Sequence, residues 1–448
     1  MSTTPSDTTR HHHAIAIVGG AVSGSEAAAI AAQRGALVVV IDQNERPFGK
    51  IEDGLPRWHV ALRQKEYAKI GENLAHDNVL FVPRTRLGHE LAWTTLTEEL
   101  GFSAVILANG AWRDRPLPAA LDALNGRGVA YQNPFVYWFN HQLDTDYRGP
   151  TFEIPDGAIV IGGGLASIDC VKIINFDLYG RALRARGIEV DAETMEHEGL
   201  PKVLADHGLT QADLGIQGAT LFYRRRAEDM PLVSSDEGNA ARMAKLEQTR
   251  VKLLTKVLEK YLVRFVPLAS PVAPIVEGDR LVGVRFQRNA QVDGKLVATD
   301  EVFDVPTTLV VSSIGSIPEQ IPGIPTRGEL YVWRDWDSGR LDSATEVYGL
   351  GNVLTGKGNI VESRKNAKKV MGLFPGRLGV GTMSHDVIGE AHAAARAEAE
   401  PVIDQALALP EIGDEAVAKI RAWVAERWAA IGYAGDYHAW VAAHPPSA

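Results

Sequence analysis

Cysteine is nearly absent from this sequence: Cys170 is the single thiol among 448 residues. One thiol excludes a disulfide within the chain, a CxxC redox pair and an iron–sulfur cluster held by four thiolates of this chain. Electron-transfer chemistry in this protein would therefore depend on a bound cofactor or on a partner protein.

Long apolar runs are also missing. No segment approaches the roughly 18 uninterrupted apolar residues that a membrane-spanning helix needs. Residues 1–13 form a polar stretch without the apolar core of a secretory signal. We expect this stretch to be a disordered tail in which His11, His12 and His13 are solvated, and we predict no metal site. These absences favour a cytoplasmic protein.

Positive charge is in deficit. The chain has 46 Lys and Arg residues against 56 Asp and Glu residues, a formal net charge of −10. A protein that grips phosphate backbones needs a positive face, so we do not expect nucleic-acid binding. The chain is too long for one ordinary hydrophobic core, and about two to three domains are expected.

A strand–turn–helix–strand pattern opens the folded part of the chain. AIAIVGG is a short apolar strand that ends in glycines, SGSEAAAIAAQRG is an alanine-rich helix that ends at Gly35, and ALVVVID is a second buried strand. Gly19, Ala21 and Gly24 occupy the GxGxxG positions, and Asp42 ends the second strand. The backbone N–H groups of such a turn bind a pyrophosphate and the acid binds ribose hydroxyls. The pattern predicts a dinucleotide site.

The same order returns later, in AIVIGGGLASIDCVKIINF and GATLFYRRR. The turn and the start of its helix comprise Gly162, Gly164, Leu165, Ala166 and Ser167. The strand that follows ends in Arg224 and Arg225 where the first unit has an acid. Cations suit a 2′-phosphate that a carboxylate would repel, so we expect this second site to prefer NADP(H) over NAD(H).

The other segments differ from these two units in composition and in the spacing of their apolar residues. Residues 180–218 form a long polar stretch, which we interpret as a helical surface insertion. Residues 250–315 change to alternating strands such as LVGVRFQRN with the turn VDGK, and close on the apolar strand TTLVVSSIGS. Near the C-terminus, Asp414 can cap a helix that Gly432 ends, and we expect the nearby tryptophans to pack in a core or an interface.

Several stretches together resemble the adrenodoxin reductase family of ferredoxin-type NADP⁺ reductases, to which the small subunit of glutamate synthase is related. They are RPFGKIEDGLPRWH, VIGGGLASID, LFYRRRAEDMP, LVVSSIGS and VYGLGNVLTGKGNI, and they occur in the order of that family. The resemblance covers residues 14–375. It implies an α/β fold with two Rossmann-like dinucleotide-binding domains, one inserted into the other, and a C-terminal helical extension.

The resemblance also implies domain boundaries. We expect an FAD-binding domain over residues 14–133 and 313–395, with an NADP-binding domain inserted over residues 134–312. Residues 396–448 would form the helical extension.

Read through the family, one set of residues would hold FAD: Gly19, Gly20, Ala21, Gly24, Asp42, Gly110, Gly351, Asn352, Gly358, Asn359 and Ile360. Gly110 belongs to the turn where the flavin domain of the family crosses towards the NADP domain. Asn352 stands where many relatives have Asp and adrenodoxin reductase has Trp. Its amide can still hydrogen-bond a ribityl or phosphate oxygen without adding negative charge.

A second set would hold NADP(H): Gly162, Gly164, Leu165, Ala166, Arg224, Arg225 and Asp236. The resemblance further implies that His59 and Asp169 form a proton-handling pair, since an Asp near a His holds the tautomer of the imidazole and tunes its pKa. Around His59 the chain departs from the family at Lys50, Glu52, Arg57 and Trp58.

We therefore predict an FAD-dependent oxidoreductase that passes electrons from NADPH through FAD to a ferredoxin-like iron–sulfur protein. Such partners are acidic, so docking on this acidic chain needs a local basic patch. Residues 363–369 and 250–264 are the candidates. The oligomeric state, a homodimer included, stays open.

Three alternatives remain at this point. The chain could be a reductase subunit that feeds an associated enzyme, with the C-terminal helices as the subunit interface. It could be a flavin-dependent monooxygenase or oxidase, although no substrate motif stands out. It could also be a dinucleotide-binding scaffold without catalysis, because Ala21 and Asn352 depart from the usual patterns.

Overall fold

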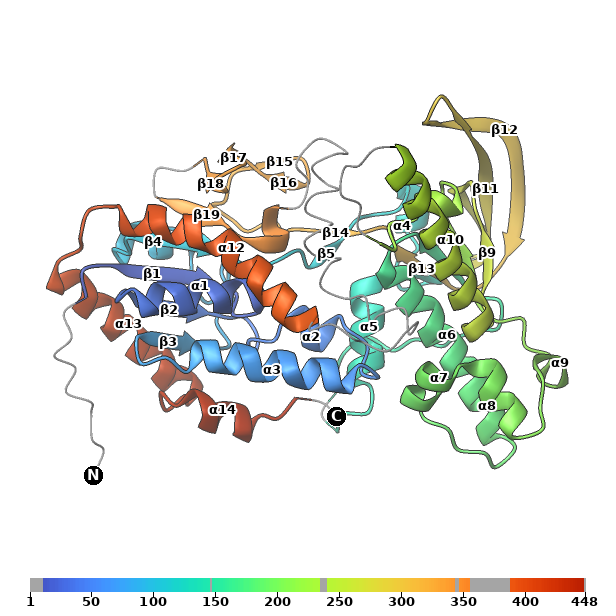
Figure 1. Cartoon of the computed structure of the whole chain (residues 1–448), viewed down its shortest axis with the longest axis horizontal. Coiled ribbons are helices and arrows are strands. Elements are labelled where there is room, and N and C mark those ends of the chain that lie inside the picture. Colours follow the sequence, from blue (N-terminus) through green and yellow to red (C-terminus); the bar gives the residue numbers. More distant parts are fainter. Residues whose placement is uncertain (1–10, 146, 234–239, 343–345, 355–386, 447–448) are drawn as a thin grey trace.

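The computed structural model describes residues 11–145, 147–233, 240–342, 346–354 and 387–446. These residues build two α/β units, which lie side by side in Figure 1, one around a mainly parallel sheet and one around a wholly parallel sheet. The expected fold class of two Rossmann-like units with a helical C-terminal region is confirmed.

The first sheet has seven strands in the order β17-β18-β19-β4-β1-β2-β3. Strands β1 to β4 and β19 run parallel, while β17 and β18 extend the sheet antiparallel beyond β19. The bounds are β1 Ala14–Val18, β2 Leu37–Ile41, β3 Val79–Val82, β4 Ala104–Leu107, β17 Trp333–Asp335, β18 Arg340–Leu341 and β19 Val347–Gly349. Strands β1 and β2 are buried throughout, as expected of continuous apolar runs in a parallel sheet that is covered on both faces.

Helices cover both faces of this sheet. Ile15 and Ile17 of β1 pack in a core with α1 Val22–Gln33, α3 Val60–Leu74, α12 Val387–Leu407 and α14 Tyr437–Ala443. The alternate β1 residues pack with α13 Asp414–Ile431 and with the π-helical turn η1 Thr95–Glu99. Figure 1 shows α12 running alongside α1.

The second sheet is parallel throughout, in the order β6-β13-β7-β8-β9. Its strands are β6 Val129–Tyr131, β7 Ile159–Gly162, β8 Thr220–Phe222, β9 Arg264–Val266 and β13 Val310–Ser313. Helices α5 Gln132–His141, α6 Leu165–Arg184 and α10 Ala240–Tyr261 contribute to the core on one face. The predicted strand–turn–helix–strand unit is thus β7, α6 and β8.

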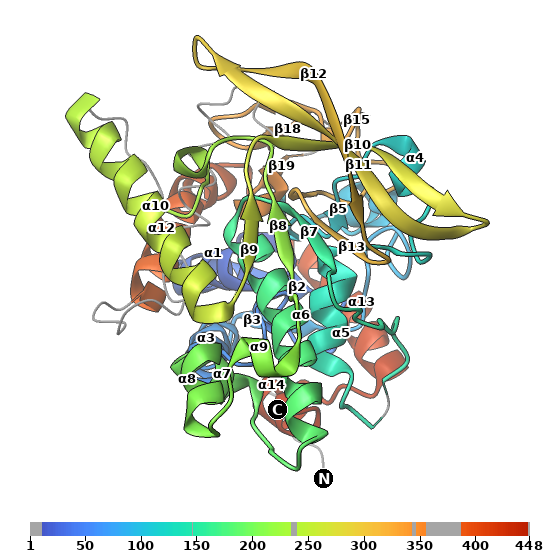
Figure 2. The ribbon, with the colours of Figure 1, turned by 90° about the vertical axis from the view of Figure 1, so that its right-hand side faces the viewer.

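An antiparallel sheet covers the opposite face of the second sheet. It comprises β10 Ala269–Glu277, β11 Arg280–Val292 and β12 Lys295–Pro306, and it packs there together with α4 Ala119–Asp122. Figure 2 shows it projecting beyond the parallel sheet. The expected VDGK turn joins β11 to β12, with Asp293 at φ 48° and Gly294 at φ 75°. This left-handed backbone is typical of a two-residue hairpin turn.

The chain crosses between the two units twice, and the crossings pair with each other. Strand β5 Arg113–Asp114 lies on the outward crossing and β14 Ser316–Ile317 on the return crossing, and the two are antiparallel partners. Five short elements complete the fold: α2 Lys50–Asp53, η2 Ala227–Asp229, β15 Thr326–Arg327, β16 Leu330–Tyr331 and η3 Gly351–Leu354.

The insertion expected over residues 180–218 is helical. It begins inside α6 and carries α7 Ala192–Glu198, α8 Leu200–Asp206 and α9 Gln211–Leu214.

At the C-terminus the helix over residues 414–431 is confirmed, with Gly432 in the left-handed conformation at its end. Gly413 is its N-cap, and Asp414 is instead its first helical residue. The boundary expected at residues 395 and 396 falls inside α12, a continuous helix whose Ala399 and Val402 belong to the core of the first unit.

The three histidines expected in a solvated tail are held by the fold. His11 is buried, with Nδ1 at 3.1 Å from Gly35 O, and His12 Nδ1 lies 2.8 Å from Glu411 Oε2. The backbone of His13 accepts a hydrogen bond from Leu37 at the start of β2. Backbone hydrogen bonds from Leu37 to His13 and from Ile412 to His12 explain the difference, because they fix this stretch against β2 and the segment before α13.

Candidate dinucleotide sites

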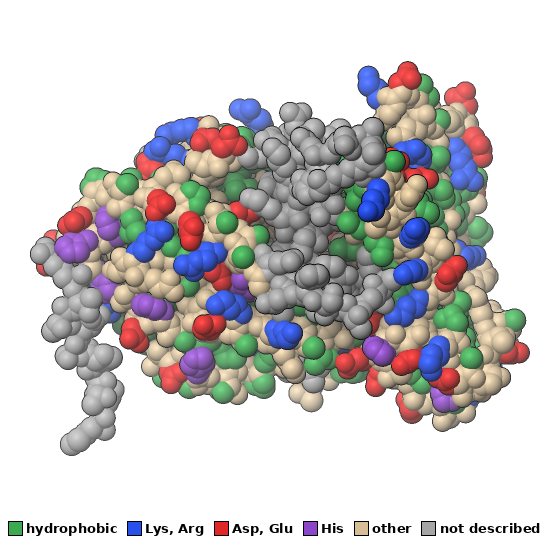
Figure 3. Space-filling view, viewed as in Figure 1, with side chains coloured by type: hydrophobic (Ala, Val, Ile, Leu, Met, Phe, Trp, Pro, Cys, Tyr) green, Lys and Arg blue, Asp and Glu red, His purple; other side chains and the backbone are tan. Residues whose placement is uncertain are grey.

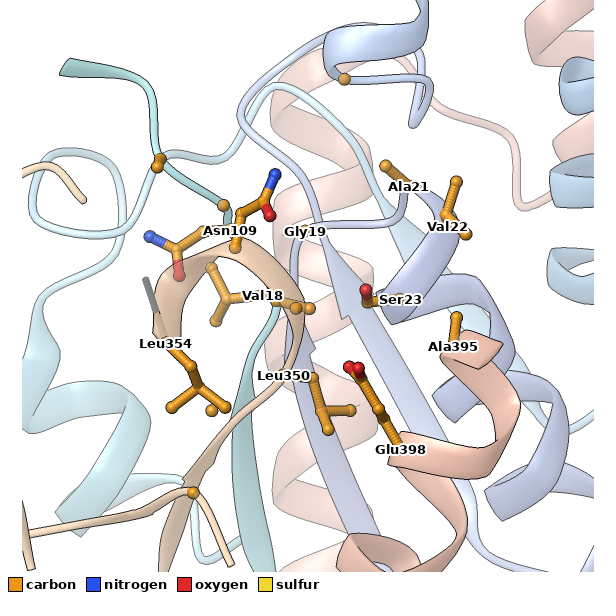
Figure 4. Close-up of a pocket in the computed structure, with 18 of the residues that line it drawn as sticks. Val18, Gly19, Ala21, Val22, Ser23, Asn109, Leu350, Leu354, Ala395 and Glu398 are labelled. Atoms are coloured by element: carbon orange, nitrogen blue, oxygen red, sulfur yellow. The ribbon is translucent and has the colours of Figure 1, made fainter. Parts of the chain in front are cut away.

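A cavity of about 400 Å³ lies at the carboxyl edge of the first sheet. Its walls come from the turns that follow β1, β2, β4 and β19 and from one side of α12. Figure 4 shows Gly19, Ala21, Val22 and Ser23 on one wall and Leu350, Ala395 and Glu398 on another. Ligands of open parallel sheets bind at this edge.

The first glycine turn is shaped by close packing. Gly19 has φ +97°, and a Cβ there would stand 2.6 Å from Ala108 O. A Cβ at Gly24 would overlap the carbonyl oxygen of Gly19. Ala21 is the N-cap of α1 and lines the cavity. The cavity therefore faces the N-terminus of α1, whose first N–H groups lack acceptors within the helix and attract an anion.

Asp42 follows β2 directly and supports this turn. Its Oδ2 accepts from the N–H of Gly20 at 2.8 Å, and its Oδ1 accepts from the N–H of Asn44 at 2.9 Å. Burial raises the pKa of Asp42 to about 6 against the lowering effect of these two bonds, and the charges of Asp53 and Glu52 raise it further. Asp42 lines the cavity as predicted, and it also holds the glycine turn.

The loop after β19 closes the cavity from the other side. Gly351 has φ +66°, and a Cβ there would overlap Ser23 Oγ at the start of α1. The Oδ1 atom of Asn352 is buried without a hydrogen-bond partner among the described residues, and Asn352 lines the cavity. A ligand that carries a hydroxyl or amide donor fits this unused acceptor.

Lys50 adds a positive charge to the cavity wall, together with Gly110 and Trp112. Its Nζ donates to Asn133 Oδ1 at 3.1 Å and to Ser316 Oγ at 3.2 Å, and lies 5.6 Å from the Trp112 ring centroid. Neighbouring Asp114 is half-buried, and partial desolvation raises its pKa to about 6, while the Lys50 charge opposes that rise.

The second turn lies at the end of β7. A Cβ at Gly162 would overlap Ser313 O, whereas a Cβ at Gly164 would meet nothing within 4 Å. Gly164 is the N-cap of α6, and Leu165 and Ala166 form its first turn. Ser167 Oγ donates back to the carbonyl oxygen of Gly164 at 2.6 Å. The backbone at Gly164 is thus open to a ligand at a helix N-terminus.

Three successive arginines follow β8, and they differ in their partners. Arg226 Nε and Nη2 donate to Asp229 at 3.2 and 3.1 Å, and Glu247 lies 3.7 Å away. For Arg224 and Arg225, no ion pair with another described residue is found; the Arg224 side chain is exposed and Arg225 half-buried. Because β8 pairs with β7, these two arginines follow the strand adjacent to the one that ends in the second turn, and their guanidinium groups are available to an anionic ligand.

His59 follows Trp58, which packs in the core of the second unit, and Asp169 lies in α6 of that unit. His59 is the N-cap of α3, and its Nε2 accepts from the indole N–H of Trp58 at 3.0 Å. Asp169 is buried in α6, one turn before Lys172, whose Nζ lies 5.5 Å from the Trp58 ring centroid. The role of the two residues as a pair stays a prediction.

Comparison with solved structures now bears on the fold. Two structures of Mycobacterium tuberculosis FprA, one in complex with NADPH and one that reveals a covalent modification of NADP⁺, each align with a TM-score of 0.58. They share 21% sequence identity with this chain, over 93% of this chain and 90% of theirs. The chain has the fold of FprA. No protein-family model and no curated protein sequence matches it.

The structure describes most of the predicted site residues, and some of them lie outside the described ranges. Gly19, Gly20, Ala21, Gly24 and Asp42 form or contact one turn. Four predicted residues lie outside the described residues: Asp236, Gly358, Asn359 and Ile360. The candidate docking stretch 363–369 lies outside them as well.

The other docking stretch, residues 250–264, comprises the second half of α10 and the start of β9, and Figure 3 shows several Lys and Arg side chains on the face where this helix runs. The arginine side chains at its two ends form hydrogen bonds with backbone carbonyl oxygens of the same unit. Arg250 donates to the carbonyl oxygens of Glu228 and Val233, both at 3.2 Å, and Arg264 donates to Gly218 O at 3.3 Å.

Sequence reasoning did not predict that Lys50, Trp112 and Glu398 line the cavity. Lys50 carried a weak signal, because it departs from the family pattern. Glu398 carried none, since it belongs to no motif and reaches the cavity only because α12 packs on α1. No helix among the described residues is both long and apolar enough to cross a membrane.

Proposed function

We propose that this protein is an FAD-dependent NADPH oxidoreductase that passes electrons to a ferredoxin-like iron–sulfur protein. One observation carries the proposal. Two helices each begin directly after a glycine turn, and the charged side chains that follow the next strand are acidic for the first turn and basic for the second. Asp42 accepts a hydrogen bond from the first turn, and Arg224 and Arg225 follow β8, the strand paired with the one that ends in the second turn.

The first site fits FAD. The N-terminus of α1 would bind the pyrophosphate, and Asp42 would accept from ribose hydroxyls through lone pairs that its backbone bonds leave unused. The buried Oδ1 of Asn352 offers an acceptor to a polar group of the same ligand. Gly110 and Lys50 would lie towards the second unit, beside the paired crossings β5 and β14.

The second site fits NADP(H). Gly164, Leu165 and Ala166 would bind its pyrophosphate at the N-terminus of α6, while Arg224 and Arg225 would bind the 2′-phosphate. The likeness in fold to FprA, which has been solved in complex with NADPH, supports this assignment. Asp236 would contribute as the family resemblance implies.

A bound flavin supplies the conversion between two-electron hydride transfer and single-electron release. The residues of the chain would position the two dinucleotides, and Lys50 would favour negative charge that develops beside it. His59 would hold or release a proton at the junction of the two units, with Asp169 as its partner. The acceptor would be external, because the single thiol, Cys170, is buried and cannot build a metal cluster alone.

Anaerobic titration with NADPH tests the cofactors. The purified protein should show a flavin spectrum that NADPH bleaches, and reoxidation should be faster with an added ferredoxin than with oxygen. Fast reoxidation by oxygen alone would favour the oxidase alternative. A protein that stays colourless after incubation with FAD would refute the proposal.

The arginines give a sharper test of the second site. Arg224→Ala and Arg225→Ala should each raise the Kd for NADPH by about 10- to 100-fold, because each removes a charge-assisted hydrogen bond, and should change NADH affinity little. Arg285→Ala is the matched control, since Arg285 is paired with Asp304 on the β11–β12 hairpin. Equal losses for both nucleotides would contradict the assignment to a 2′-phosphate site.

A further inference from the structure

The segment that leads from α2 to α3 is clamped by the second unit through Asn140 of α5. Asn140 Nδ2 donates to the carbonyl oxygens of Glu52 at 2.8 Å and Leu55 at 3.0 Å. Its Oδ1 accepts from the N–H of Arg57 at 2.9 Å. Because Asn140 is buried, water does not compete with these bonds, and the backbone that carries Trp58 and His59 is held in one path.

Trp58 is inserted from this segment into the core of the second unit. The indole is 5% exposed, with ring centroids of Phe139 at 5.0 Å and Phe176 at 5.2 Å. Lys172 Nζ lies 5.5 Å from the Trp58 ring centroid and donates to Glu196 Oε1 of α7 at 3.1 Å. Neighbours from α5 and α6 thus fix the plane of the indole, and the helical insertion supplies the counter-charge of Lys172.

The indole N–H points at the adjacent imidazole, with Trp58 Nε1 at 3.0 Å from His59 Nε2. An indole nitrogen can only donate, so the imidazole nitrogen that faces it must accept and cannot itself carry a proton. We propose that Trp58 is a positioning residue for His59, which keeps Nε2 as an acceptor and the proton of the neutral ring on Nδ1.

This arrangement limits what His59 can do. A proton can be added to Nε2 only if the bond to Trp58 breaks, and the packing around the indole opposes such a movement. The group able to donate from the neutral ring is then Nδ1–H. The meaning of this for catalysis rests on the proposed function, which gives His59 a proton-handling role, whereas the tautomer itself does not depend on that function.

NMR spectroscopy of protein labelled with ¹⁵N in the histidine rings tests the proposal. The chain has 13 histidines, so the His59 signals are assigned by their loss in His59→Gln. At a pH where the ring is neutral, wild-type His59 should show an unprotonated Nε2 and a protonated Nδ1. In Trp58→Phe, which keeps an aromatic ring but lacks the N–H, the Nε2 signal should move towards the protonated range and the titration midpoint of His59 should rise.

Trp138→Phe is the matched control, because Trp138 is a 6% exposed tryptophan of the same core cluster. Its His59 signals should match those of the wild type. A wild-type spectrum with the proton on Nε2 would overturn the proposal without any variant, even if Trp58→Phe failed to fold. Unchanged His59 signals in folded Trp58→Phe would overturn it too.

The outcomes separate this inference from the proposed function. A preparation that binds no flavin and ignores NADPH would defeat the proposed function but leave the tautomer measurement valid. Conversely, an active NADPH oxidoreductase in which Trp58→Phe leaves the His59 tautomer unchanged would retain its function and refute the role of Trp58.

Discussion

Two glycines of the second turn, two residues apart, have opposite surroundings. A Cβ at Gly162 would overlap a backbone oxygen of β13, so this glycine serves the packing of turn against strand. Gly164 has open space on its Cβ side and φ −92°, ψ 177°, a conformation that alanine adopts without strain. The fold therefore does not require glycine at position 164. Close approach of a ligand to the backbone would be the reason for a glycine there.

Gly164→Ala should fold as the wild type does, with a Tm within about 2 °C, because neither a clash nor an unfavourable φ is introduced. Its added methyl group faces the space where a pyrophosphate would lie, so the Kd for NADPH should rise by about tenfold or more. Thermal unfolding and NADPH titration measure the two effects.

Gly162→Ala is the counterpart and should lower the Tm by several degrees through its overlap with Ser313 O. If Gly164→Ala bound NADPH as tightly as the wild type, the second turn would not be a nucleotide site.

At the scale of elements, a buried histidine joins three helices. His392 of α12 has Nδ1 at 2.8 Å from Glu26 Oε1 of α1, and Nε2 at 2.9 Å from Glu66 Oε2 of α3. Asn73 Nδ2 donates to Glu26 at 2.7 Å, Arg396 lies 3.7 Å from Glu26, and Lys69 adds a more distant positive charge. Burial by itself lowers the pKa of His392, but the hydrogen bonds and charges of the two carboxylates outweigh it and raise the pKa to about 9.

This cluster predicts a pH dependence of stability. The pKa of His392 is higher in the folded chain, at about 9, than the ordinary 6.5 of an unfolded chain. The stabilisation of the folded chain by protonated His392 is therefore complete below pH 6.5, and it is lost as the pH rises to 9. The difference in free energy of unfolding between wild type and His392→Gln should shrink by about 3 kcal/mol across that range.

Urea unfolding at intervals from pH 6 to 9.5 measures this difference. His89→Gln is the control for replacing a histidine outside this cluster, since the His89 side chain is 75% exposed. A constant difference between wild type and His392→Gln would mean that His392 is neutral between the two carboxylates.

At the scale of the whole molecule, the two units are joined by more than the chain crossings. Besides the β5–β14 pair, His141 of α5 lies between Asp53 of α2, at 3.1 Å, and Asp144, at 2.9 Å. Asn140 binds three backbone groups of α2 and of the segment after it, and Trp58 packs in the core of the second unit. These contacts predict that the position of α5 controls the backbone of residues 52–59.

Asn140→Ala should lower the free energy of unfolding by about 2 to 4 kcal/mol, because it leaves buried backbone groups without partners. The amide of Arg57 should exchange with solvent faster, since its acceptor is lost. Urea unfolding and hydrogen exchange followed by mass spectrometry measure these effects. Gln142→Ala, at the residue that follows α5, should change neither; equal exchange in Asn140→Ala and wild type would contradict the clamp.

Both strand–turn–helix units could be predicted from sequence because their signals are local. Apolar runs such as LVVVI, glycines at fixed spacing and an acid or arginines at the next strand end all lie within short stretches. The cavity wall from α12 could not be predicted in this way. Glu398 lies far along the chain from Gly19, and neither its spacing nor its surroundings indicate that the two share a cavity.

The sequence by itself determined the two glycine turns, their opposite charge signatures and the lack of the thiols that a four-thiolate iron–sulfur cluster would need. These properties depend on residue type and short-range order, which set backbone conformation within a few residues. Only the tertiary structure decided that His11 is buried, that His392 meets Glu26 and Glu66, and that Trp58 faces His59 from the core of the other unit. The physical reason is that hydrogen-bond partners and burial depend on which distant segments pack together. Until that packing is known, the sequence does not distinguish a polar side chain that is buried and paired from one that is exposed to water.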